Sequence, residues 1–478
     1  MKLRKALALG LCTTAMAVTS FAGCSVAKNE VSSSDASTST NLKGEGKDEL
    51  HILIYAQEHE KAAYEKQIKK FTEAHKDQIK NVNFEVTTQD EYNTKMTAAI
   101  TANDLPDIFY VGPASVKEYV DNGYCIPLDK YVDQTAVDNL WPEIKSAYQY
   151  DGKEIGKGSL YCLPKDLSCF AFAYNKDLFD KAGLDYPDPE KPYTYDEFLE
   201  VCKKLTKDTD GDGEIDQWGV ANANAFGMTP YMYSNGVKFL SDDYKKVNLT
   251  DNKALKDSFQ FYTDLTSKYK VTPSVEQDTA MGGYQRWLDG QIGFYACGTW
   301  DVAAFMDQAT FPYKWDLCGW PVGPDGDGKS TTWLGTVGFA VSKTCKHPDL
   351  ATELITALST DLDGQKALSG ETTGKSMQIP NIKDYATGDW KQAVKDGKIP
   401  YASNVDVIFG YIEGNDKYKG IFEETTYTPN NEWWTTFLEG IPNVQNGSES
   451  ASDYLKEVEP KCQEALDNAW DLSSGNKN

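Results

Sequence analysis

The chain has 478 residues and a formal net charge of −24 at pH 7. Its length exceeds what one hydrophobic core usually supports, so we expect two lobes or domains. The negative charge argues against nucleic acid as a partner and against broad electrostatic attachment to an anionic membrane, because both require clustered Lys and Arg. Aromatic residues make up 12% of the chain, which suits a protein that binds flat, partly apolar solutes.

The His and Cys content gives no metal or catalytic motif. The chain has four histidines without the spacing of a zinc helix, which argues against a zinc site or a His-based triad. It also has ten cysteines and no CxxC pair. Disulfides, as in many exported proteins, and buried free thiols both remain open.

The amino terminus predicts export. Three positive charges within Met1–Lys5 precede the apolar stretch 6–23, the pattern of a signal peptide over residues 1–23. The junction Phe-Ala-Gly-Cys resembles the lipobox of bacterial lipoproteins, with Phe21 where Leu is usual, so Cys24 is the expected lipidation site. An ordinary secretory peptide with an incidental cysteine is the alternative. Residues 24–47 contain almost no large apolar side chain, which predicts a flexible tether with a reach of roughly 25 Å.

Strand and helix patterns alternate over the next segment. The expected elements are a strand at 50–56, a helix bearing Tyr64, Ile68 and Phe71, a strand at 82–86, a helix bearing Tyr92, Met96 and Ile100, and a strand at 107–111. This order predicts a mainly parallel sheet flanked by helices, with ligands beyond the carboxyl ends of the strands. Tyr55 and Glu58 are therefore candidate binding residues, as is the stretch 107–112.

The stretch 160–183 predicts a strand that turns sharply into a short helix. Phe170, Phe172 and Tyr174 alternate with alanines, which is the period of a strand. Asn175 is a plausible helix cap, and Gly183 is well placed to end the helix. Such a segment, a third of the way along the chain, indicates a crossing between two bodies.

Several of these motifs resemble one family. Y-x-L-P-x-D followed by YNK-x-LF-x-KAG, and LPDIFYVG followed by YVDNGYCIPLDKYV, are similar to family 1 extracellular solute-binding proteins, the sugar-binding subunits of ABC importers. The resemblance implies an α/β fold of the two-lobed periplasmic-binding-protein type (type II), with mainly parallel sheets and the solute in the cleft. By this similarity Asp107, Tyr110 and Lys165 are cleft candidates. For Asp107 the alternative is a strand-start cap.

A second segment extends the resemblance. GQIGFYACGTW is similar to the family pattern G-x-x-A-M-x-x-x-G-x-W, in which the turn presents an aromatic residue to sugar. This implies Trp300 as the main site residue, with a Trp buried between helix and sheet as the alternative. Trp333 is the next candidate, and Tyr231 belongs to an irregular stretch expected to form a cleft wall.

The acidic loop DTDGDGEIDQWG predicts a structural Ca²⁺ site. Its acids fall at alternate positions of an EF-hand-like loop, which brings their oxygens together. The bidentate Glu expected at the last position is replaced by Gly219, and a solvated acidic turn is the alternative. The expected ligands are Asp208, Asp210, Asp212 and Asp216, with Glu214 through its backbone carbonyl.

These expectations combine into one architecture. The first lobe is predicted at 48–165 and 336–390, and the second at 166–335 and 391–472, with crossings near 163–169, 334–339 and Asn381. The resemblance implies a monomer on the extracellular face of the cell membrane. Solute binding closes its two lobes by a hinge, and the closed form docks on ABC permease subunits.

The composition favours a neutral sugar as the solute. Aromatic rings cover the C–H face of a pyranose, and Asp, Asn, Glu or Lys bind its hydroxyls. After the signal peptide Arg286 is the one arginine, which disfavours a strongly anionic solute. A binding protein rather than an enzyme is therefore expected. A secreted glycoside hydrolase, a calcium-dependent adhesin and a receptor for another small solute are the alternatives.

Overall fold

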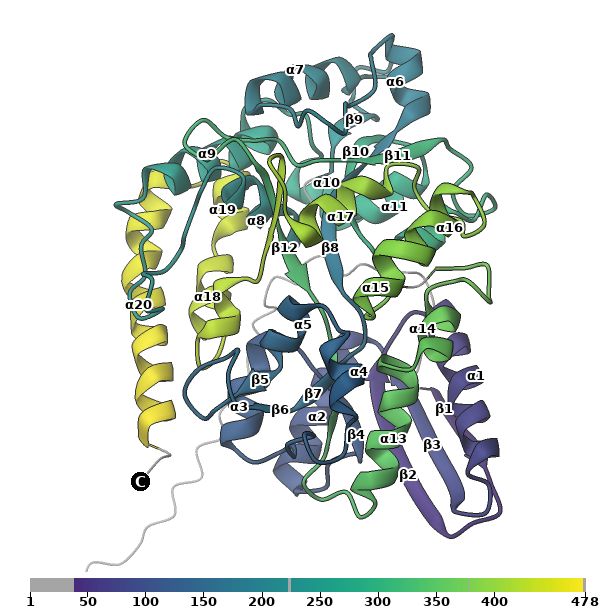
Figure 1. Cartoon of the computed structure of the whole chain (residues 1–478). Helices are drawn as coiled ribbons and strands as arrows, with labels where there is room; N and C mark the ends of the chain where they lie inside the picture. The colour runs from purple at the N-terminus through teal and green to yellow at the C-terminus, as the bar shows by residue number, and fades with distance from the viewer. Residues whose placement is uncertain (1–37, 222–224, 377, 476–478) are drawn as a thin grey trace, which may run out of the picture.

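The computed structural model describes residues 38–221, 225–376 and 378–475. The expected signal peptide and Cys24 lie outside the described residues. The described chain forms two six-stranded sheets, each flanked by helices, and these stand one above the other as two lobes (Figure 1). The two-lobed α/β class predicted from the sequence is therefore confirmed.

The first lobe contains a sheet of strand order β1-β3-β2-β4-β13-β7. Strands β3, β2 and β4 run parallel, whereas β1 and β13 pair antiparallel with their neighbours. The strands and helices expected between residues 50 and 111 are all present. The bounds are β1 Thr38–Lys43, β2 Asp48–Tyr55, α1 Glu58–Ala74, β3 Ile79–Thr87, α2 Gln89–Ala102, β4 Ile108–Val111, β7 Cys162–Pro164 and β13 Gly338–Val341.

The second lobe contains a sheet of order β14-β12-β8-β10-β9, and β11 also pairs with β8. The central strand β8 runs antiparallel to β10, β11 and β12. Both sheets are thus mixed, which corrects the expectation of mainly parallel sheets. The reason is that β8 and β13 enter their sheets directly from the other lobe, without a crossover helix. The bounds are β8 Ser168–Asn175, β9 Trp218–Val220, β10 Ile292–Gly298, β11 Trp315–Cys318, β12 Ser330–Gly335 and β14 Tyr418–Ile421.

The other elements surround these sheets. Two short strands, β5 Gln149–Tyr150 and β6 Ser159–Leu160, form a separate pair. In chain order the remaining helices are η1 Pro113–Ser115, α3 Val116–Asp121, α4 Gln134–Asp138, α5 Pro142–Ala147, α6 Lys176–Ala182, α7 Tyr195–Leu205, α8 Ala225–Tyr233, α9 Lys253–Ser267, α10 Val275–Ala280, α11 Gly283–Leu288, α12 Val302–Phe305, α13 Pro348–Ser359, α14 Leu362–Leu368, α15 Lys383–Tyr385, η2 Ala386–Trp390, α16 Lys391–Lys395, α17 Val405–Glu413, η3 Glu424–Tyr427, α18 Glu432–Leu438, α19 Ile441–Gln445 and α20 Ala451–Gly475.

The chain crosses between the lobes three times, and the first two crossing segments are adjacent. The chain leaves the first sheet at Pro164 and enters the second at Ser168, and it returns between Gly335 and Gly338. Asn381 is fully buried beside them, and its Nδ2 donates to the carbonyl oxygens of Pro164 at 2.7 Å, Lys165 at 3.0 Å and Ser359 at 3.2 Å. The side-chain amide of Asn381 therefore holds the first crossing segment against the third crossing, which passes near Asn381.

The strand and helix predicted at the first crossing are confirmed. Strand β8 is buried along its whole length, and Phe172 packs on Phe198 and Trp320 in the core of the second lobe. The Oδ1 of Asn175 accepts from Leu178 N at 3.2 Å and caps α6. Gly183 ends that helix at φ 66°, a conformation that glycine adopts without steric cost.

The tether predicted for residues 24–47 is wrong for its last part, residues 38–43, and residues 24–37 lie outside the described residues. Residues 38–43 form the edge strand β1, paired antiparallel with β3 from Thr38 opposite Val86 to Lys43 opposite Asn81. An edge strand needs backbone partners rather than a buried face, so the lack of large apolar side chains did not prevent pairing. Its Thr and Ser side chains also suit a strand that is mostly exposed to water.

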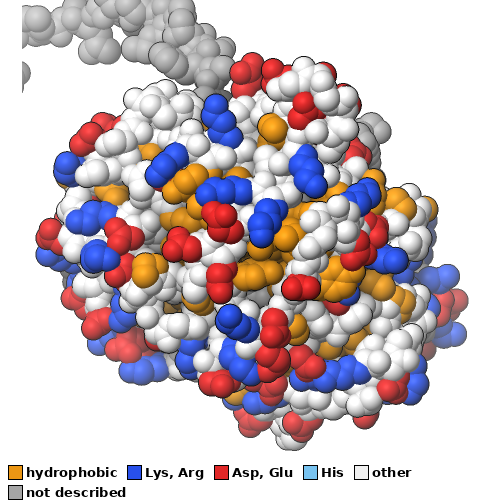
Figure 2. Space-filling view, turned by 90° about the horizontal axis from the view of Figure 1, so that it is seen from above, with side chains coloured by type: hydrophobic (Ala, Val, Ile, Leu, Met, Phe, Trp, Pro, Cys, Tyr) orange, Lys and Arg blue, Asp and Glu red, His pale blue; other side chains and the backbone are white. Residues whose placement is uncertain are grey.

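Thiols, helices and surface charge complete the description. The eight cysteines within the described residues are free, and all but Cys345 are buried. In the described part of the chain, no helix has both the length and the apolar character needed to cross a membrane. Figure 2 views the molecule from above and shows Lys and Arg interspersed with Asp and Glu on that face, around hydrophobic side chains.

The Asn381→Ala substitution is expected to lower the free energy of unfolding by about 1–3 kcal/mol, because buried carbonyls lose a donor. Urea unfolding of the two proteins measures the change. Asn93→Ala on the exposed face of α2 is the matched control and should stay within about 0.5 kcal/mol of wild type. Equal effects of the two substitutions would contradict the role of Asn381.

Candidate functional site

Three aromatic side chains meet where β8 leaves the crossing segment. The ring centroid of Phe170 lies 5.2 Å from that of Trp300 and 4.9 Å from that of Trp333. The two indoles are 6.1 Å apart. Trp300 is half-buried, in the turn after β10, whereas Trp333 is 6% exposed on β12. The structure therefore brings together the two tryptophans predicted from the sequence, and leaves Trp300 the more accessible.

Two glycines make room for these indoles. A Cβ atom on Gly298 would lie 2.4 Å from Cε2 of Trp300, and one on Gly335 would lie 2.2 Å from Cζ3 of Trp333. Any side chain at either position must displace the neighbouring ring, since real Cβ atoms do not approach so closely. The sequence motif predicted the tryptophans, but the need for these glycines appears only in the packing.

A buried ion cluster, Glu60, Lys165 and Asp166, lies at the first crossing segment. The Nζ of Lys165 is 2.8 Å from Glu60 Oε1 and 3.0 Å from Asp166 Oδ2. Burial disfavours the Lys165 ammonium, but the charges of Asp166 and Glu60 outweigh that effect and raise its pKa well above the usual value. Lys165, expected in the cleft, is thus held by two carboxylates and by its own N–H, which donates to Val337 O at 2.6 Å.

Asp301 of the second lobe faces this cluster. It is buried, and its Oδ2 accepts from Gly298 N at 3.1 Å, which fixes the turn that carries Trp300. Burial raises the pKa of Asp301 to about 7, and the carboxylate of Glu60 in the first lobe adds to the rise. The turn after β10 and the start of α1 therefore approach each other across the crossing segments.

Two of the tyrosines predicted for the first lobe adjoin the ion cluster. Tyr55 ends β2 and is half-buried, with its ring centroid 5.3 Å from that of Tyr110. Burial raises the pKa of Tyr55 to about 12, while the Lys165 ammonium opposes the rise. Tyr110 is buried at 2% exposure. Glu58 is the first residue of α1, and its side chain lies outside the described part of the structure.

Asp107 was expected in the cleft and lies elsewhere. It precedes β4, at the end where Ile108 pairs with Val341, whereas Val111 at the other end pairs with Gly338 beside the crossing. Its Oδ2 accepts from His51 N at 2.9 Å. The alternative role, a cap at the start of the strand, is the one that the structure shows, because a strand-start carboxylate bonds the free N–H of its neighbour.

Tyr231 was expected in a cleft wall and is a core residue instead. It is 1% exposed on α8, and its ring lies 6.0 Å from Phe172 and 5.4 Å from Trp320. The stretch read as irregular from its Asn, Gly and Pro content ends in a helix with Pro230 inside it. Tertiary packing therefore overrode the local composition.

A cavity of about 600 Å³ lies between the lobes. None of the seven predicted binding residues whose side chains the structure describes lines it. Its size falls within the range of small-molecule sites. One wall is α5 of the first lobe, and the other walls come from loops and strands of the second lobe. The lining includes Glu143, Ser146 and Ala147 of the first lobe, and Tyr233, Asp242, Tyr244, Asp325, Thr331, Leu334, Phe422, Glu424 and Tyr427 of the second.

The sequence held only a weak signal for this cavity. Its tyrosines form no periodic pattern, since Tyr233 ends α8, Tyr427 ends η3 and Tyr244 lies in a loop, and the lining residues are spread over positions 143–427. Glu424 accepts from the backbone N–H groups of Phe239 at 3.0 Å and Leu240 at 2.9 Å. Burial nevertheless raises its pKa to about 7.

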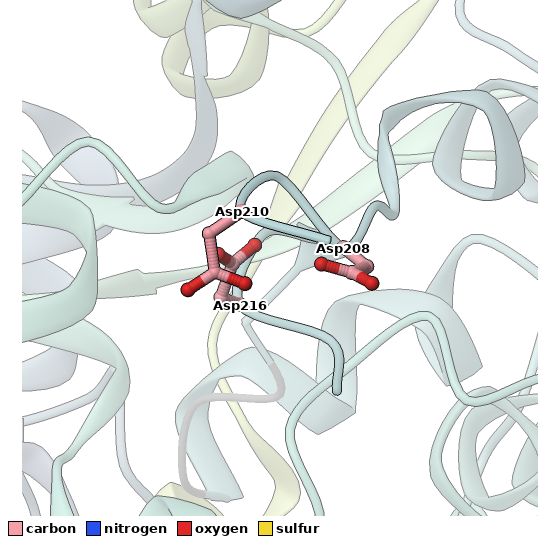
Figure 3. A group of neighbouring side chains, drawn as sticks. All are labelled: Asp208, Asp210 and Asp216. Atoms are coloured by element: carbon pink, nitrogen blue, oxygen red, sulfur yellow. The ribbon is translucent and has the colours of Figure 1, made fainter. Parts of the chain in front are cut away.

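The acidic loop brings together three of its four predicted carboxylate ligands. Carboxylate oxygens of Asp208, Asp210 and Asp216 all lie within 4.8 Å of one another (Figure 3). The N–H groups of Gly213 and Gly211 donate to Asp208 and lower its pKa. Asp212 is outside the group, and its Oδ1 accepts from Glu214 N at 2.8 Å.

Comparison with known proteins agrees with this architecture. Residues 55–362 match the family described as bacterial extracellular solute-binding protein, and the chain belongs to that family. It is 25% identical over 315 residues to the diacetylchitobiose binding protein of Streptomyces coelicolor, covering 64% of this chain and 69% of that protein. It is 22% identical over 213 residues to the maltotriose-binding protein of Pyrococcus abyssi, covering 44% of this chain and 42% of that protein.

Solved structures share the fold. An ABC substrate-binding protein from Listeria monocytogenes in complex with cycloalternan gives a TM-score of 0.73 at 20% identity, covering 87% of this chain and 98% of that one. The maltose/maltodextrin-binding domain from Bdellovibrio bacteriovorus, bound to maltotriose, gives 0.70 at 20% identity, covering 88% and 100%. At this identity the similarity defines the two-lobed fold.

Asp301→Asn is expected to reduce the pH dependence of stability. The pKa of Asp301 rises from 3.8 unfolded to about 7 folded, so between these values the folded state binds more protons and the free energy of unfolding falls as pH rises. Removing the carboxyl should flatten this fall in part, because Glu423 and Glu424 also have pKa values raised to about 7 by burial.

Urea unfolding at several pH values between about 4 and 8 measures this slope. The control is Asp251→Asn, which removes the same charge from an exposed position and should leave the slope as in wild type. If Asp301→Asn and wild type have equal slopes, Asp301 does not titrate as its burial implies.

Proposed function

We propose that this chain is the extracellular substrate-binding subunit of an ABC importer, which captures a neutral oligosaccharide between its lobes and delivers it to a membrane permease. The observation that carries the proposal is the cavity of about 600 Å³ lined by both lobes, with tyrosines, hydroxyls and carboxylates in its walls. These are the groups that bind the faces and hydroxyls of sugar rings. The sugar-binding relatives support this solute class.

The charged groups favour a neutral solute. Arg286 is occupied: its guanidinium donates to Met281 O and Gln277 O, each at 3.0 Å, and lies over the ring of Trp218. Lys165 is held between two carboxylates. Lys238 and Lys419 line the cavity, but five carboxylates line it with them, and Lys238 pairs with Asp242 at 2.7 Å. The lining therefore lacks the cluster of cationic donors that a phosphate or sulfate would need.

Attachment and partners follow from the same proposal. Cys24 would carry the lipid, with a tether that ends where β1 begins at Thr38. The protein would act as a monomer, and solute binding would close its lobes by movement at the crossing segments before docking on the permease. No covalent chemistry is required, so a bound glycan should be recovered intact. Slow cleavage of the glycan would favour the hydrolase alternative.

Trp300→Ala is expected to weaken oligosaccharide binding about tenfold or more, because a ring that covers the apolar face of a sugar is lost. Calorimetric titration of the mature protein without its lipid, against maltotriose, mannotriose and diacetylchitobiose, measures this. The Tm of the ligand-free protein should change little, since Trp300 is half-buried.

The control is Trp320→Ala. That side chain is fully buried and donates from Nε1 to Phe170 O at 3.0 Å, so its loss should lower the Tm strongly. An equal fall in Tm for Trp300→Ala, with unchanged sugar affinity, would mean that Trp300 is a core residue. Failure of wild type to bind any of the three sugars would contradict the sugar assignment.

We also infer that the acidic loop binds Ca²⁺ in a structural role, through Asp208, Asp210 and Asp216. Ca²⁺ takes six to eight oxygen ligands, so backbone oxygens and water must complete the shell. Gly211 at φ 82° and Gly213 at φ 99° allow the tight turn that brings the carboxylates together. The three carboxylates repel one another, and a bound cation would offset this repulsion.

Asp210→Asn is expected to lower the Ca²⁺ affinity about tenfold or more, because one charged ligand is lost. Calorimetric titration of Ca²⁺ into chelator-treated protein measures it. Asp212→Asn removes the same charge from the same loop but lies outside the cluster, so it should bind Ca²⁺ nearly as wild type does. Equal losses for both variants would indicate a general charge effect rather than a defined site.

A further inference from the structure

Two tyrosines stack on each other in the wall of the interlobe cavity. Tyr244 lies in the turn between α8 and α9, and Tyr427 is the last residue of η3. Their ring centroids are 4.8 Å apart with an interplanar angle of 19°. Both residues line the cavity and are half-buried, so part of the stacked pair remains open to it.

The backbone of Tyr244 is held in an unfavourable conformation. Its φ of 59° lies in the left-handed region, which costs free energy for a bulky residue and is common for Gly or Asn. The turn is fixed by Ser241, whose carbonyl accepts from Tyr244 N at 2.8 Å and whose Oγ accepts from Lys246 N at 3.0 Å. The strained turn directs a large aromatic ring to the cavity, where a smaller residue would fit the backbone better.

The pair is also tied to the opposite lobe. Lys117 of α3 reaches across from the first lobe, and its Nζ donates to Tyr427 O at 2.9 Å. The same Nζ lies 5.0 Å from the ring centroid of Trp470 on α20. Trp470 in turn donates from Nε1 to Tyr244 O at 3.1 Å. Lys117 thus contacts the carbonyl of Tyr427 directly, and it contacts Trp470, which bonds the carbonyl of Tyr244. Lobe opening must break both contacts of Lys117.

We propose that Tyr244 and Tyr427 form a second ring-binding subsite, which stacks against an outer sugar ring of a neutral oligosaccharide. Lys117 acts as a positioning residue that fixes the pair when the lobes close. The proposal rests on the proposed function. Ser146 of the first lobe and Asp242 of the second line the same cavity and offer hydroxyl and carboxylate partners to the sugar.

The subsite predicts a dependence on chain length. Trp300 does not line the cavity, so the tyrosine pair would contact a different ring from the one that Trp300 covers. An oligosaccharide that occupies both places must be longer than one that occupies the Trp300 position alone. The pair would therefore set the preferred length of the ligand rather than the ability to bind sugar.

The test is calorimetric titration of the mature protein with disaccharides and tetrasaccharides of the maltose, mannose and chitin series. Tyr427→Ala and Tyr244→Gly should weaken tetrasaccharide binding about tenfold and leave disaccharide binding within about twofold. Glycine accepts the backbone of Tyr244, so this variant should fold. Lys117→Met should speed release of the tetrasaccharide more than release of the disaccharide, because the pair is no longer fixed by closure.

The matched control is Tyr186→Ala, which removes a tyrosine of the second lobe that is 42% exposed and outside the cavity, and it should bind as wild type does. Wild-type binding with unchanged affinities in both tyrosine variants overturns the subsite alone. Equal losses for both lengths, together with a lower Tm, also overturn it and make the pair structural. Failure of wild type to bind any of these sugars overturns the sugar assignment and the subsite with it.

Discussion

The buried ammonium of Lys165 sets the main constraint on this molecule. A charge removed from water is stable only when paired, and its partners Glu60 and Asp166 come from the start of α1 and from the crossing segment itself. Glu60 also accepts from Gln57 N at 2.9 Å and so caps α1. Because removing one partner would leave an uncompensated buried charge, the sheet, the helix and the crossing are held in one arrangement. Any hinge motion must leave this cluster intact and bend the chain beside it.

The groups around the cluster divide into rigid supports and accessible surfaces. Asp301 fixes the turn that carries Trp300, while Gly298 leaves space for the indole. On the other side, the cavity is enclosed by loops of the second lobe and by α5. The aromatic residues of the core and those of the site are chemically alike, and burial separates them: Tyr231 and Trp320 are enclosed, whereas Trp300 and Tyr244 keep part of their surface open.

Sequence reasoning was most reliable where one local rule governed the structure. The strand β8, its cap Asn175 and the terminating Gly183 follow from side-chain periodicity and from backbone preferences of single residues. It failed for Asp107, because that prediction followed the family resemblance although Asp107 precedes its strand, away from the carboxyl ends at which ligands bind. It failed for β1 too, because an edge strand forms through backbone pairing that leaves little trace in the side chains.

The order of strands and helices, the acidic loop and the tryptophan motif were thus determined by the sequence itself, since each depends on neighbours a few residues apart. The tertiary structure decided which of these residues are accessible. Lys117 and Tyr427 are 310 positions apart, and Trp470 and Tyr244 are 226 apart, yet they meet beside one cavity. The first contact joins the two lobes and the second joins distant parts of one lobe. Both depend on how the whole chain packs, which no pattern of neighbouring residues encodes.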